Sequence, residues 1–475
     1  MTRIYFDTNV FSNLKKNQHS LYQELNKLIE HYRDNVSYMF SHAHVRDKKN
    51  DETELKYDDL AFMESIVKNN YLCYHGEAKA TSFYLATPTV AFKDEIETPE
   101  TNNLLAFLYN DPEDEPEIIA LKENLRSLLL ATTIPTDLLD LKSIPNDQKE
   151  FIQKFLPANQ DHISMLDIFK NFENFYHELF SNSQTYRDLR KLIDENLNRG
   201  KYSTANGSLD FDRALKNSIF KKSFTDYILD AFKQQSQKEE IPYYDFFLQA
   251  YNSLDLLGIS KDKLSRKNTY NNLFNDGLHS YYARYCDYLV TDDEGLQRKS
   301  KTLYNLYESA TRVLSVEEFI NAFPSIGKNT EDDVEELLKN LVNNTTDKYI
   351  LKHEVIDTGH YTIFLPETNY LNAFDEIITL MHNEEHYIFL NKNDKHWLSQ
   401  MNFHEIGMLI KKCLSLFGTD LLKHKTFDFE IEVEEIRNKK WRGRHWKIGN
   451  TSFCLHYSEI IKKITLALGP LPTYE

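Results

Sequence analysis

The stretch Arg3-Ile4-Tyr5-Phe6-Asp7-Thr8-Asn9-Val10-Phe11 gives the first evidence of the fold. Its apolar run, Ile4 to Phe6, is too short for a helix and is typical of a buried strand. The run stops at Asp7, and the Asp, Thr and Asn that follow are turn and capping residues. In an open α/β sheet, however, the carboxyl end of a strand is also where ligands bind. The stretch therefore predicts a strand whose end is either a turn or part of a site.

Two later stretches place further acids near strand ends. In the first, the apolar run Tyr38-Met39-Phe40 ends at Ser41, a good helix N-cap, so that Asp47 falls on the second turn of a helix. In the second, Asp276 is expected to open a helix, and the run Tyr288-Leu289-Val290 reads as a short buried strand. That strand is followed by Thr291-Asp292-Asp293. The sequence thus predicts several strand-end carboxylates that one sheet could bring together.

Together these stretches resemble the PIN-domain nuclease family. Its pattern is a strand ending in Asp-Thr-Asn, a second strand followed by Ser and an acid about six positions on, a helix opened by an acid, and a strand ending in Thr-x-Asp. Asp47 stands six positions after Ser41, although the family usually has Glu there, and Asp293 stands two after Thr291. The resemblance covers residues 1 to about 80 and about 270 to 320. It implies catalytic and metal-binding roles for Asp7, Asp47, Asp276 and Asp293, with support from Asn9, Thr291 and Asp292.

Four clustered carboxylates favour one kind of chemistry. They repel one another and cannot all stay ionised in a dry pocket, unless a hard cation binds between them. Mg²⁺ and Mn²⁺ prefer oxygen ligands and keep several waters, one of which can attack a phosphodiester. The resemblance therefore implies a metal-dependent nuclease that uses Mg²⁺ or Mn²⁺ and cuts nucleic acid, with RNA as the expected substrate.

Length and composition bound the architecture. The chain has 475 residues, of which 41% are hydrophobic and 13% aromatic, with only 13 Gly and 12 Pro, which favours several helix-rich domains. The net charge of −17 argues against a general nucleic-acid coat protein, whereas a nuclease can engage its substrate through a metal and local basic patches. Four widely separated Cys without a CxxC pair, no signal peptide and no long apolar run predict a cytoplasmic protein without a membrane span.

The order of patterns predicts an α/β fold: a PIN-like parallel sheet flanked by helices, interrupted by a large α-helical insertion and followed by a smaller α+β domain. We expect the first part of the PIN-like domain at residues 1–86, the insertion at 87–262, the second part at 263–325 and the C-terminal domain at 326–475. A single helix is expected over residues 12–34, long helices at about 160–182, 184–197, 209–236 and 243–257, and C-terminal strands including Phe427 to Val433. The insertion is expected to lie over the carboxylates and restrict the substrate.

Two basic patches are candidates for substrate binding. The first follows the Thr291-Asp292-Asp293 turn and contains Arg298, Lys299 and Lys301, although a solvated helix start explains it equally well. The second is the most basic run of this acidic chain, in which Trp441, Arg442, Arg444 and Trp446 combine phosphate-binding with base-stacking side chains. A β-hairpin around Gly443 or a protein interface explains this run as well. The histidines His42, His44 and His279 are more often surface or packed residues than ligands.

Other functions stay open. The chain could be a binding or scaffold protein that keeps a PIN-like fold and works through its C-terminal domain. An aspartyl-phosphate phosphatase is disfavoured, because it needs an acid two residues after the first Asp and this chain has Asn9 there. A homodimer or a regulatory protein partner is compatible with the sequence.

Overall fold

The computed structural model describes residues 1–49, 51–97, 133–135, 162–193, 215–217, 221–233, 241–256, 270–327, 333–357, 359–366, 369–382, 385–393, 398–458 and 463–470. The chain divides into two compact units: the first contains Met1–Lys93 and His279–Glu475, and the second contains Asp94–Leu278. Within the described ranges, no helix combines the length and the apolar character that crossing a bilayer requires.

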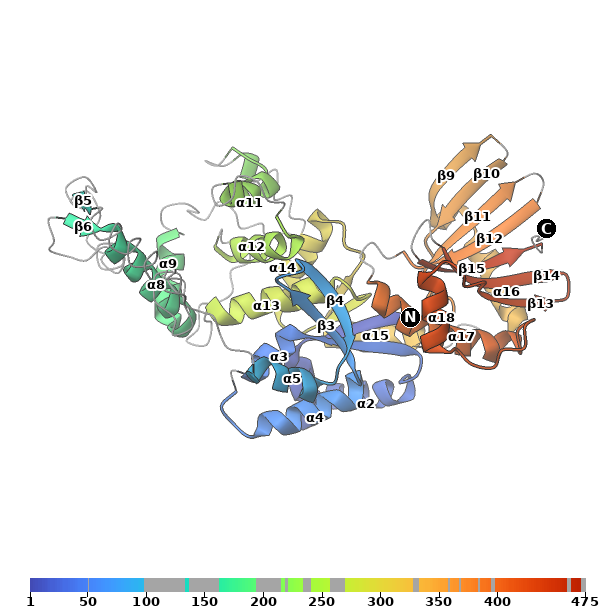
Figure 1. The fold of residues 1–475 in the computed structure, drawn as a ribbon, viewed down its shortest axis with the longest axis horizontal. Helices are drawn as coiled ribbons and strands as arrows, with labels where there is room; N and C mark the ends of the chain where they lie inside the picture. The colour runs from blue at the N-terminus through green and yellow to red at the C-terminus, as the bar shows by residue number, and fades with distance from the viewer. Residues whose placement is uncertain are drawn as a thin grey trace, which may run out of the picture. The chain divides into compact units, whose positions relative to one another are not determined.

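A six-stranded sheet forms the N-terminal part of the first unit (Figure 1). Its order is β4-β3-β2-β1-β7-β8, and every neighbouring pair is parallel except the β3-β4 hairpin. The strands are β1 (Thr2–Phe6), β2 (Val36–Ser41), β3 (Asn70–His75), β4 (Ala80–Leu85), β7 (Tyr288–Val290) and β8 (Arg312–Leu314). The sheet confirms a mixed α/β architecture with a parallel sheet, and the antiparallel edge strand β4 is an addition that the sequence did not suggest.

Helices lie before, between and after these strands along the chain, and most of them contribute buried apolar residues to one core with the sheet. They are α1 (Thr8–Lys16), α2 (Ser20–His31), α3 (His42–Lys49), α4 (Leu55–Val67), α5 (Pro88–Glu97), α13 (Tyr270–Ala283), α14 (Glu294–Leu306) and α15 (Val316–Gly327). The single helix expected over residues 12–34 is in fact split. Asn17 ends α1 in the left-handed region (φ 50°), a conformation that Asn tolerates and that stops the helix before α2 begins.

The second unit is mainly helical where the structure describes it, as the sequence predicted. Its helices are α8 (Met165–Ser181), α9 (Ser183–Ile193), α11 (Phe224–Lys233) and α12 (Tyr243–Leu256). A short antiparallel pair, β5 (Thr133–Pro135) and β6 (His162–Ser164), was not expected.

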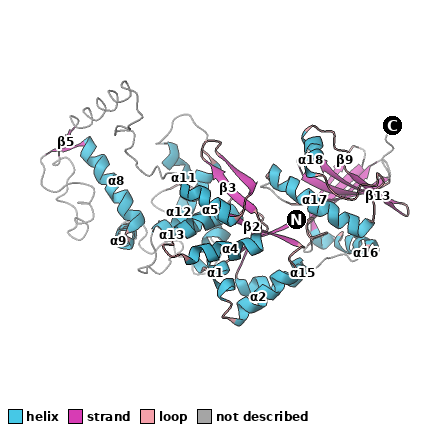
Figure 2. Ribbon diagram, turned by 60° about the horizontal axis from the view of Figure 1, so that its bottom comes forward, coloured by secondary structure: helices cyan, strands magenta, loops and turns pink. Residues whose placement is uncertain are grey.

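The C-terminal part of the first unit is a seven-stranded antiparallel sheet in the order β13-β14-β15-β12-β11-β10-β9. Its strands lie beside α17 and α18 (Figure 2). The elements are α16 (Val334–Asn344), η4 (Asp347–Tyr349), β9 (Ile350–Ile356), β10 (Gly359–Phe364), β11 (Glu376–His382), β12 (Glu385–Asn391), α17 (Ser399–Phe417), α18 (Phe429–Arg437), β13 (Arg444–Ile448), β14 (Thr451–Ser458) and β15 (Lys463–Gly469).

One prediction for this region is wrong. The alternating residues Phe427 to Val433 were expected to form a strand, but α18 begins at Phe429. The Asp428 side chain caps the helix by accepting a hydrogen bond from the Ile431 N–H. Val433 and Ile436, three positions apart, are the buried face of α18. The helical period therefore outweighs the local alternation.

Buried polar contacts join β1 to the C-terminal part of the first unit. Arg3 on β1 donates two hydrogen bonds to Glu405 on α17, at 2.7 and 2.8 Å, and both side chains are buried. The backbone N–H of Thr2 donates to the carbonyl of Asn372. The first strand is thus anchored to the C-terminal part of the chain as well as to its own sheet.

Candidate functional site

The candidate site lies where the strand order of the six-stranded sheet reverses. β2 and β3 lie on one side of β1, and β7 and β8 lie on the other. β1 pairs directly with β7, so that Ile4 lies beside Tyr288 and Phe6 lies beside Val290. In doubly wound sheets this switch point, at the carboxyl ends of the strands, is where ligands bind. Asp7 follows β1 and Thr291 follows β7, so the sheet places both residues at that point.

Asp7 is a buried carboxylate held by both of its oxygens. Its Oδ1 accepts from the Val10 N–H at 2.8 Å and caps α1, and its Oδ2 accepts from the Thr291 hydroxyl. Only 3% of the residue is exposed, and burial raises the pKa of Asp7, against the lowering effect of these two hydrogen bonds. The negative charge of Asp293 raises it further. The two acids therefore lie close enough to repel.

Asp293 is bound to the same Thr291 hydroxyl through its backbone. Its N–H donates to Thr291 Oγ1 at 3.0 Å, and its Oδ1 caps α14 by accepting from the Leu296 N–H at 2.8 Å. The side chain is exposed. Thr291 thus holds the backbone of one acid and the carboxylate of the other, which gives a physical role to the Thr-x-Asp spacing.

Asp47 projects from α3, whose start is fixed by Ser41 as predicted: Ser41 Oγ accepts from the Ala43 N–H at 3.2 Å. Asp47 Oδ2 accepts hydrogen bonds from the Thr8 hydroxyl and from His279 Nε2, the latter at 3.1 Å. Burial works to raise the pKa of Asp47, but the hydrogen bond and charge of His279, together with Thr8, outweigh it and lower the pKa.

Tyr5 and His279 form a hydrogen-bonded chain that reaches Asp47. Tyr5 had no predicted role beyond the buried strand, and His279 was interpreted as more often a surface or packed residue than a ligand. The Tyr5 hydroxyl lies 2.8 Å from His279 Nδ1 and 2.6 Å from Ser41 Oγ, and burial raises the pKa of Tyr5 well above its usual value. Tyr5 therefore stays protonated, and by donating to His279 Nδ1 it leaves the His279 Nε2–H to face Asp47. The strand period was the available signal, because it puts Tyr5 on the opposite face of β1 from Phe6.

His44 is a structural member of the same network. Its Nδ1 accepts from the Ser41 N–H at 3.1 Å, so its Nε2 carries the proton and donates to the Phe6 carbonyl at 2.8 Å. Burial, and next the nearby His279, lower the pKa of His44 to about 3. His44 is consequently neutral at physiological pH and ties α3 to the end of β1.

Asp276 occupies a different position on its helix from the one that the sequence predicted. It was expected to open a helix, but α13 begins at Tyr270 and puts Asp276 on its second turn. The helix starts earlier because Leu273 extends its buried face by one turn. Asp276 belongs to the second compact unit, and it precedes His279 by three residues on α13.

Asp292 and Asn9 are the two other residues to which the resemblance gives a supporting role. Asp292, considered as an alternative to Asp293, accepts from the Tyr22 hydroxyl at 2.8 Å and from the Val316 N–H at 2.9 Å. It fastens α2 and the start of α15 to the end of β7. Asn9 is exposed in the first turn of α1.

The basic residues after Asp293 are on α14 and differ in exposure. Arg298 is exposed and pairs with Glu294 at 2.9 Å, Lys301 is exposed, and Lys299 is buried. Two further lysines, Lys15 and Lys48, lie near Thr8 and both bind Asp59 at 2.6 Å. Of the predicted patch, Arg298 and Lys301 are open to solvent.

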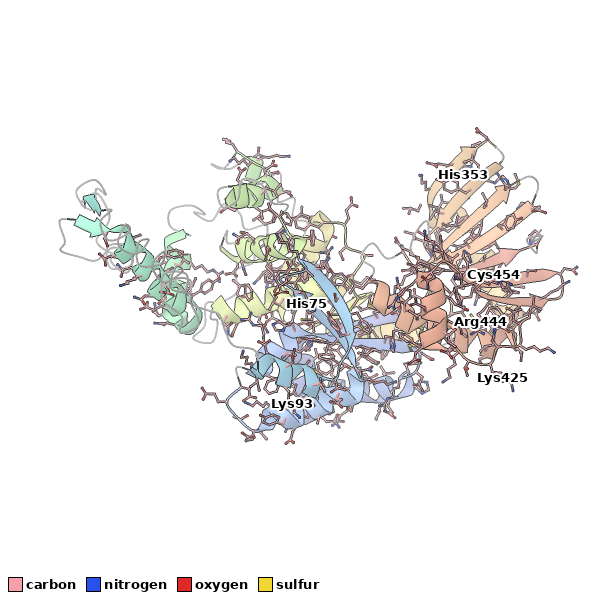
Figure 3. The ribbon with its side chains drawn as sticks, viewed as in Figure 1. His75, Lys93, His353, Lys425, Arg444 and Cys454 are labelled. Atoms are coloured by element: carbon pink, nitrogen blue, oxygen red, sulfur yellow. The ribbon has the colours of Figure 1, made fainter. Side chains whose placement is uncertain are left out.

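Two residues of the C-terminal basic run, Arg444 and Trp446, are buried in the core of the C-terminal part of the chain. Arg444, labelled in Figure 3, is 1% exposed and donates to Asp420 at 2.9 Å and to Glu432. Trp446 is equally buried and donates from Nε1 to the Gly418 carbonyl, and Trp441 Nε1 donates to Glu432. Arg444 and Trp446, two of the candidates for substrate binding, are core residues, and Asp420 and Glu432 neutralise the buried guanidinium. Arg442 is exposed.

The donor chemistry of the site fits a hard divalent cation. Asp7 and Asp293 offer carboxylate oxygens at the ends of the adjacent strands β1 and β7. Burial and the charge of Asp293 raise the pKa of Asp7, and a bound cation would stabilise its ionised form. As the side chains stand, no group of three or more His, Cys, Asp or Glu within the described ranges is spaced to hold an ion.

Comparison with known proteins adds no assignment. No family model matches the chain, no curated protein matches it, and no solved structure matches it.

Proposed function

We propose that this chain is a cytoplasmic, metal-dependent endonuclease with a PIN-like fold that hydrolyses phosphodiester bonds, with RNA as its substrate. The observation that carries the proposal is the pair Asp7 and Asp293, joined through the Thr291 hydroxyl at the switch point of a parallel sheet. A buried acid whose pKa is raised by its burial and by a neighbouring acid is typical of a functional site in a cleft.

Each residue has a defined part in this proposal. Asp7, Asp293 and Asp47 would hold Mg²⁺ or Mn²⁺, with Asp276 as the fourth acid that the family resemblance implies. When bound, the ion would activate a water and neutralise charge on the phosphate. Thr291 keeps one oxygen of Asp7 oriented, and Thr8 with His279 restricts the rotation of Asp47. Arg298 and Lys301 are the exposed cations that would contact neighbouring phosphates.

The test is cleavage of single-stranded RNA and DNA with Mg²⁺, Mn²⁺ or EDTA, comparing the wild type with Asp7→Asn and Asp293→Asn. Asn keeps the shape of each side chain and its capping oxygen, so folding is retained while the charge is lost. We expect metal-dependent cutting of RNA by the wild type alone. Cutting that persists in EDTA or in both variants would sink the proposal.

A scaffold role through the C-terminal domain is the alternative that the same experiment separates. A scaffold with a PIN-like fold would bind no ion at the acids and would cut neither substrate. Calorimetric titration with Mn²⁺ checks this independently of cleavage. Heat of binding that disappears in Asp7→Asn would support the metal site, and its absence from the wild type would favour the scaffold.

A further inference from the structure

A cavity of about 670 Å³ opens at the other end of the six-stranded sheet, away from the acids. It is lined by residues at the amino ends of β2 and β3, including Asn35, Ser37 and Asn70, and by residues of α17, including His404 and Met408. All of them belong to the first compact unit. The volume is in the range of sites for small ligands, about 300–1,000 Å³.

The walls of this cavity carry a concentration of positive charge in a chain whose net charge is −17. Four cationic side chains and one acid line it: Arg33, Lys68, Lys411 and Lys412, with Asp34. Arg33 donates to the Ser65 carbonyl at 2.9 Å and lies 3.7 Å from Glu30 in an exposed pair. Lys68 is 3.9 Å from Asp34 in an exposed pair, a contact that contributes little and leaves the ammonium free to approach a ligand. Lys411 is exposed, and no ion pair is found for it among the described residues. The cavity therefore suits an anion.

One lining residue, Asn70, has a buried side-chain acceptor without a partner among the described residues. Asn70 is 7% exposed, and its Nδ2 donates to the Tyr38 carbonyl at 3.0 Å. That bond fixes the orientation of the amide, and Asn70 Oδ1 has no partner among the described residues. A buried acceptor without a donor is unfavourable, so a ligand that supplies an N–H would relieve it.

The backbone at Lys68 is held in a conformation that side chains rarely adopt. Its φ is 58° and its ψ is −109°, a combination that favours glycine. Strain of this kind persists where surrounding structure enforces it and gathers at ligand sites. Here it places a lysine, where a glycine would be more stable, at the entrance of a cationic cavity.

We propose that this cavity binds a nucleotide. The phosphate would lie among Lys68, Lys411 and Arg33, and an amino or imino group of the base would donate to Asn70 Oδ1. The apolar side chains of Ile66, Leu371 and Met408 line the same cavity and suit the flat face of a base. A free phosphate would occupy only a small part of the volume and would leave Asn70 unpaired. The proposal does not depend on the nuclease function.

The test is isothermal titration of the full chain with four probes: AMP, ribose 5-phosphate, inorganic phosphate and a short single-stranded RNA. The first variant is Lys411→Gln, which removes an exposed charge. The second is Lys68→Gly, which removes a charge and relieves the backbone strain. The matched control is Lys425→Gln, an exposed lysine outside the cavity (Figure 3).

We expect the wild type to bind one AMP, more tightly than ribose 5-phosphate or inorganic phosphate, and each cavity variant to weaken binding about tenfold. Lys68→Gly should do so while its melting temperature stays equal or rises, which a structural role for Lys68 would not produce. Lys425→Gln should bind as the wild type does.

Four results would overturn the proposal. The first is no saturable binding of AMP up to about 1 mM. The second is unchanged affinity in both cavity variants. The third is binding of the RNA alone, lost in both variants, which would make the cavity a nucleic-acid groove instead. Binding of AMP equal to that of inorganic phosphate would likewise show that the base is not recognised.

Discussion

His279 Nε2 lies 3.1 Å from Asp47 Oδ2, and the other ring nitrogen, Nδ1, lies 2.8 Å from the Tyr5 hydroxyl. One imidazole therefore links a buried tyrosine of β1 to an acid of α3. The link fixes which ring nitrogen carries a proton and which way the carboxylate turns. In this respect it resembles the arrangement in which an outer hydrogen bond orients a ligand or catalytic side chain.

The coupling between Tyr5 and His279 is measurable. Tyr5→Phe and His279→Leu each remove hydrogen bonds without opening a large cavity, and each should lower the free energy of unfolding by about 1–3 kcal/mol. Because the two groups share a bond, the double variant should lose less than the sum, with a coupling of about 0.5–3 kcal/mol. Denaturant unfolding of the four proteins checks this, and simple additivity would contradict the shared bond.

Asp7→Asn should leave the fold intact and raise its stability at neutral pH. The folded-state pKa of Asp7 lies above its unfolded value, mainly through burial, so ionisation disfavours the folded state as pH rises through that range. Asn removes this effect and still accepts from the Val10 N–H. We expect an equal or higher melting temperature at pH 7, with cleavage reduced at least about 100-fold. Thr291→Val, which removes the hydroxyl donor to Asp7, is the companion variant, and a large fall in melting temperature for Asp7→Asn would mean that the charge itself is structural.

The sequence predicted the strand-end acids because that signal is local. Each depends on a few apolar residues followed at once by Asp or Thr, and both the β1 and β7 ends lie where this pattern put them. The Tyr5 and His279 pair was not predicted, since the two residues are 274 positions apart and neither has a local motif. Only the pairing of β1 with β7, and the helix that precedes β7, brings them together.

His44 should make the protein sensitive to acid. Burial holds its folded-state pKa near 3, below the ordinary value of 6.5, so its stabilising contribution is complete above about pH 6.5 and is lost as pH falls toward 3. The slope reaches about 1.4 kcal/mol per pH unit in that window. His44→Gln should flatten the decline in unfolding free energy between pH 6.5 and pH 4, whereas His386→Gln, at an exposed position, should not. Equal slopes in wild type and His44→Gln would show that His44 is not buried as described.

Removing one member of the Arg3–Glu405 pair should lower the free energy of unfolding more than removing both members. Both groups are buried, and Glu405 also accepts from the N-terminal amine of Met1 at 3.2 Å. Arg3→Met removes the guanidinium that lies closest to the carboxylate and should lower the free energy of unfolding by about 3–5 kcal/mol. Adding Glu405→Met should restore much of that loss. The control is Arg298→Met, whose exposed partner is Glu294 and whose cost should stay below about 1 kcal/mol. A double variant no more stable than Arg3→Met would indicate that Glu405 serves another partner.

The C-terminal basic run shows that local composition does not reveal which basic residues are buried. Read along the chain, Trp441, Arg442, Arg444 and Trp446 form one basic and aromatic patch. In the fold, the alternation along β13 turns Arg444 and Trp446 inward, and Asp420 and Glu432 supply the opposite charges from more distant positions. Whether an arginine is a surface or a core residue depends on these partners, which no local window contains.

This difference between neighbouring arginines gives the last prediction. Arg444→Gln leaves two acids without their shared cation and should lower the free energy of unfolding by about 3–5 kcal/mol, measured by thermal or denaturant unfolding. Arg442→Gln should change stability by less than about 0.5 kcal/mol, because the side chain is exposed. If the run contacts RNA, as its composition indicates, Arg442→Gln alone should weaken RNA binding in the folded protein. The slope of log binding constant against log salt concentration should then fall by about one released counterion. An unchanged affinity and salt slope in Arg442→Gln would assign the run entirely to folding, since Arg444 is already engaged by Asp420 and Glu432.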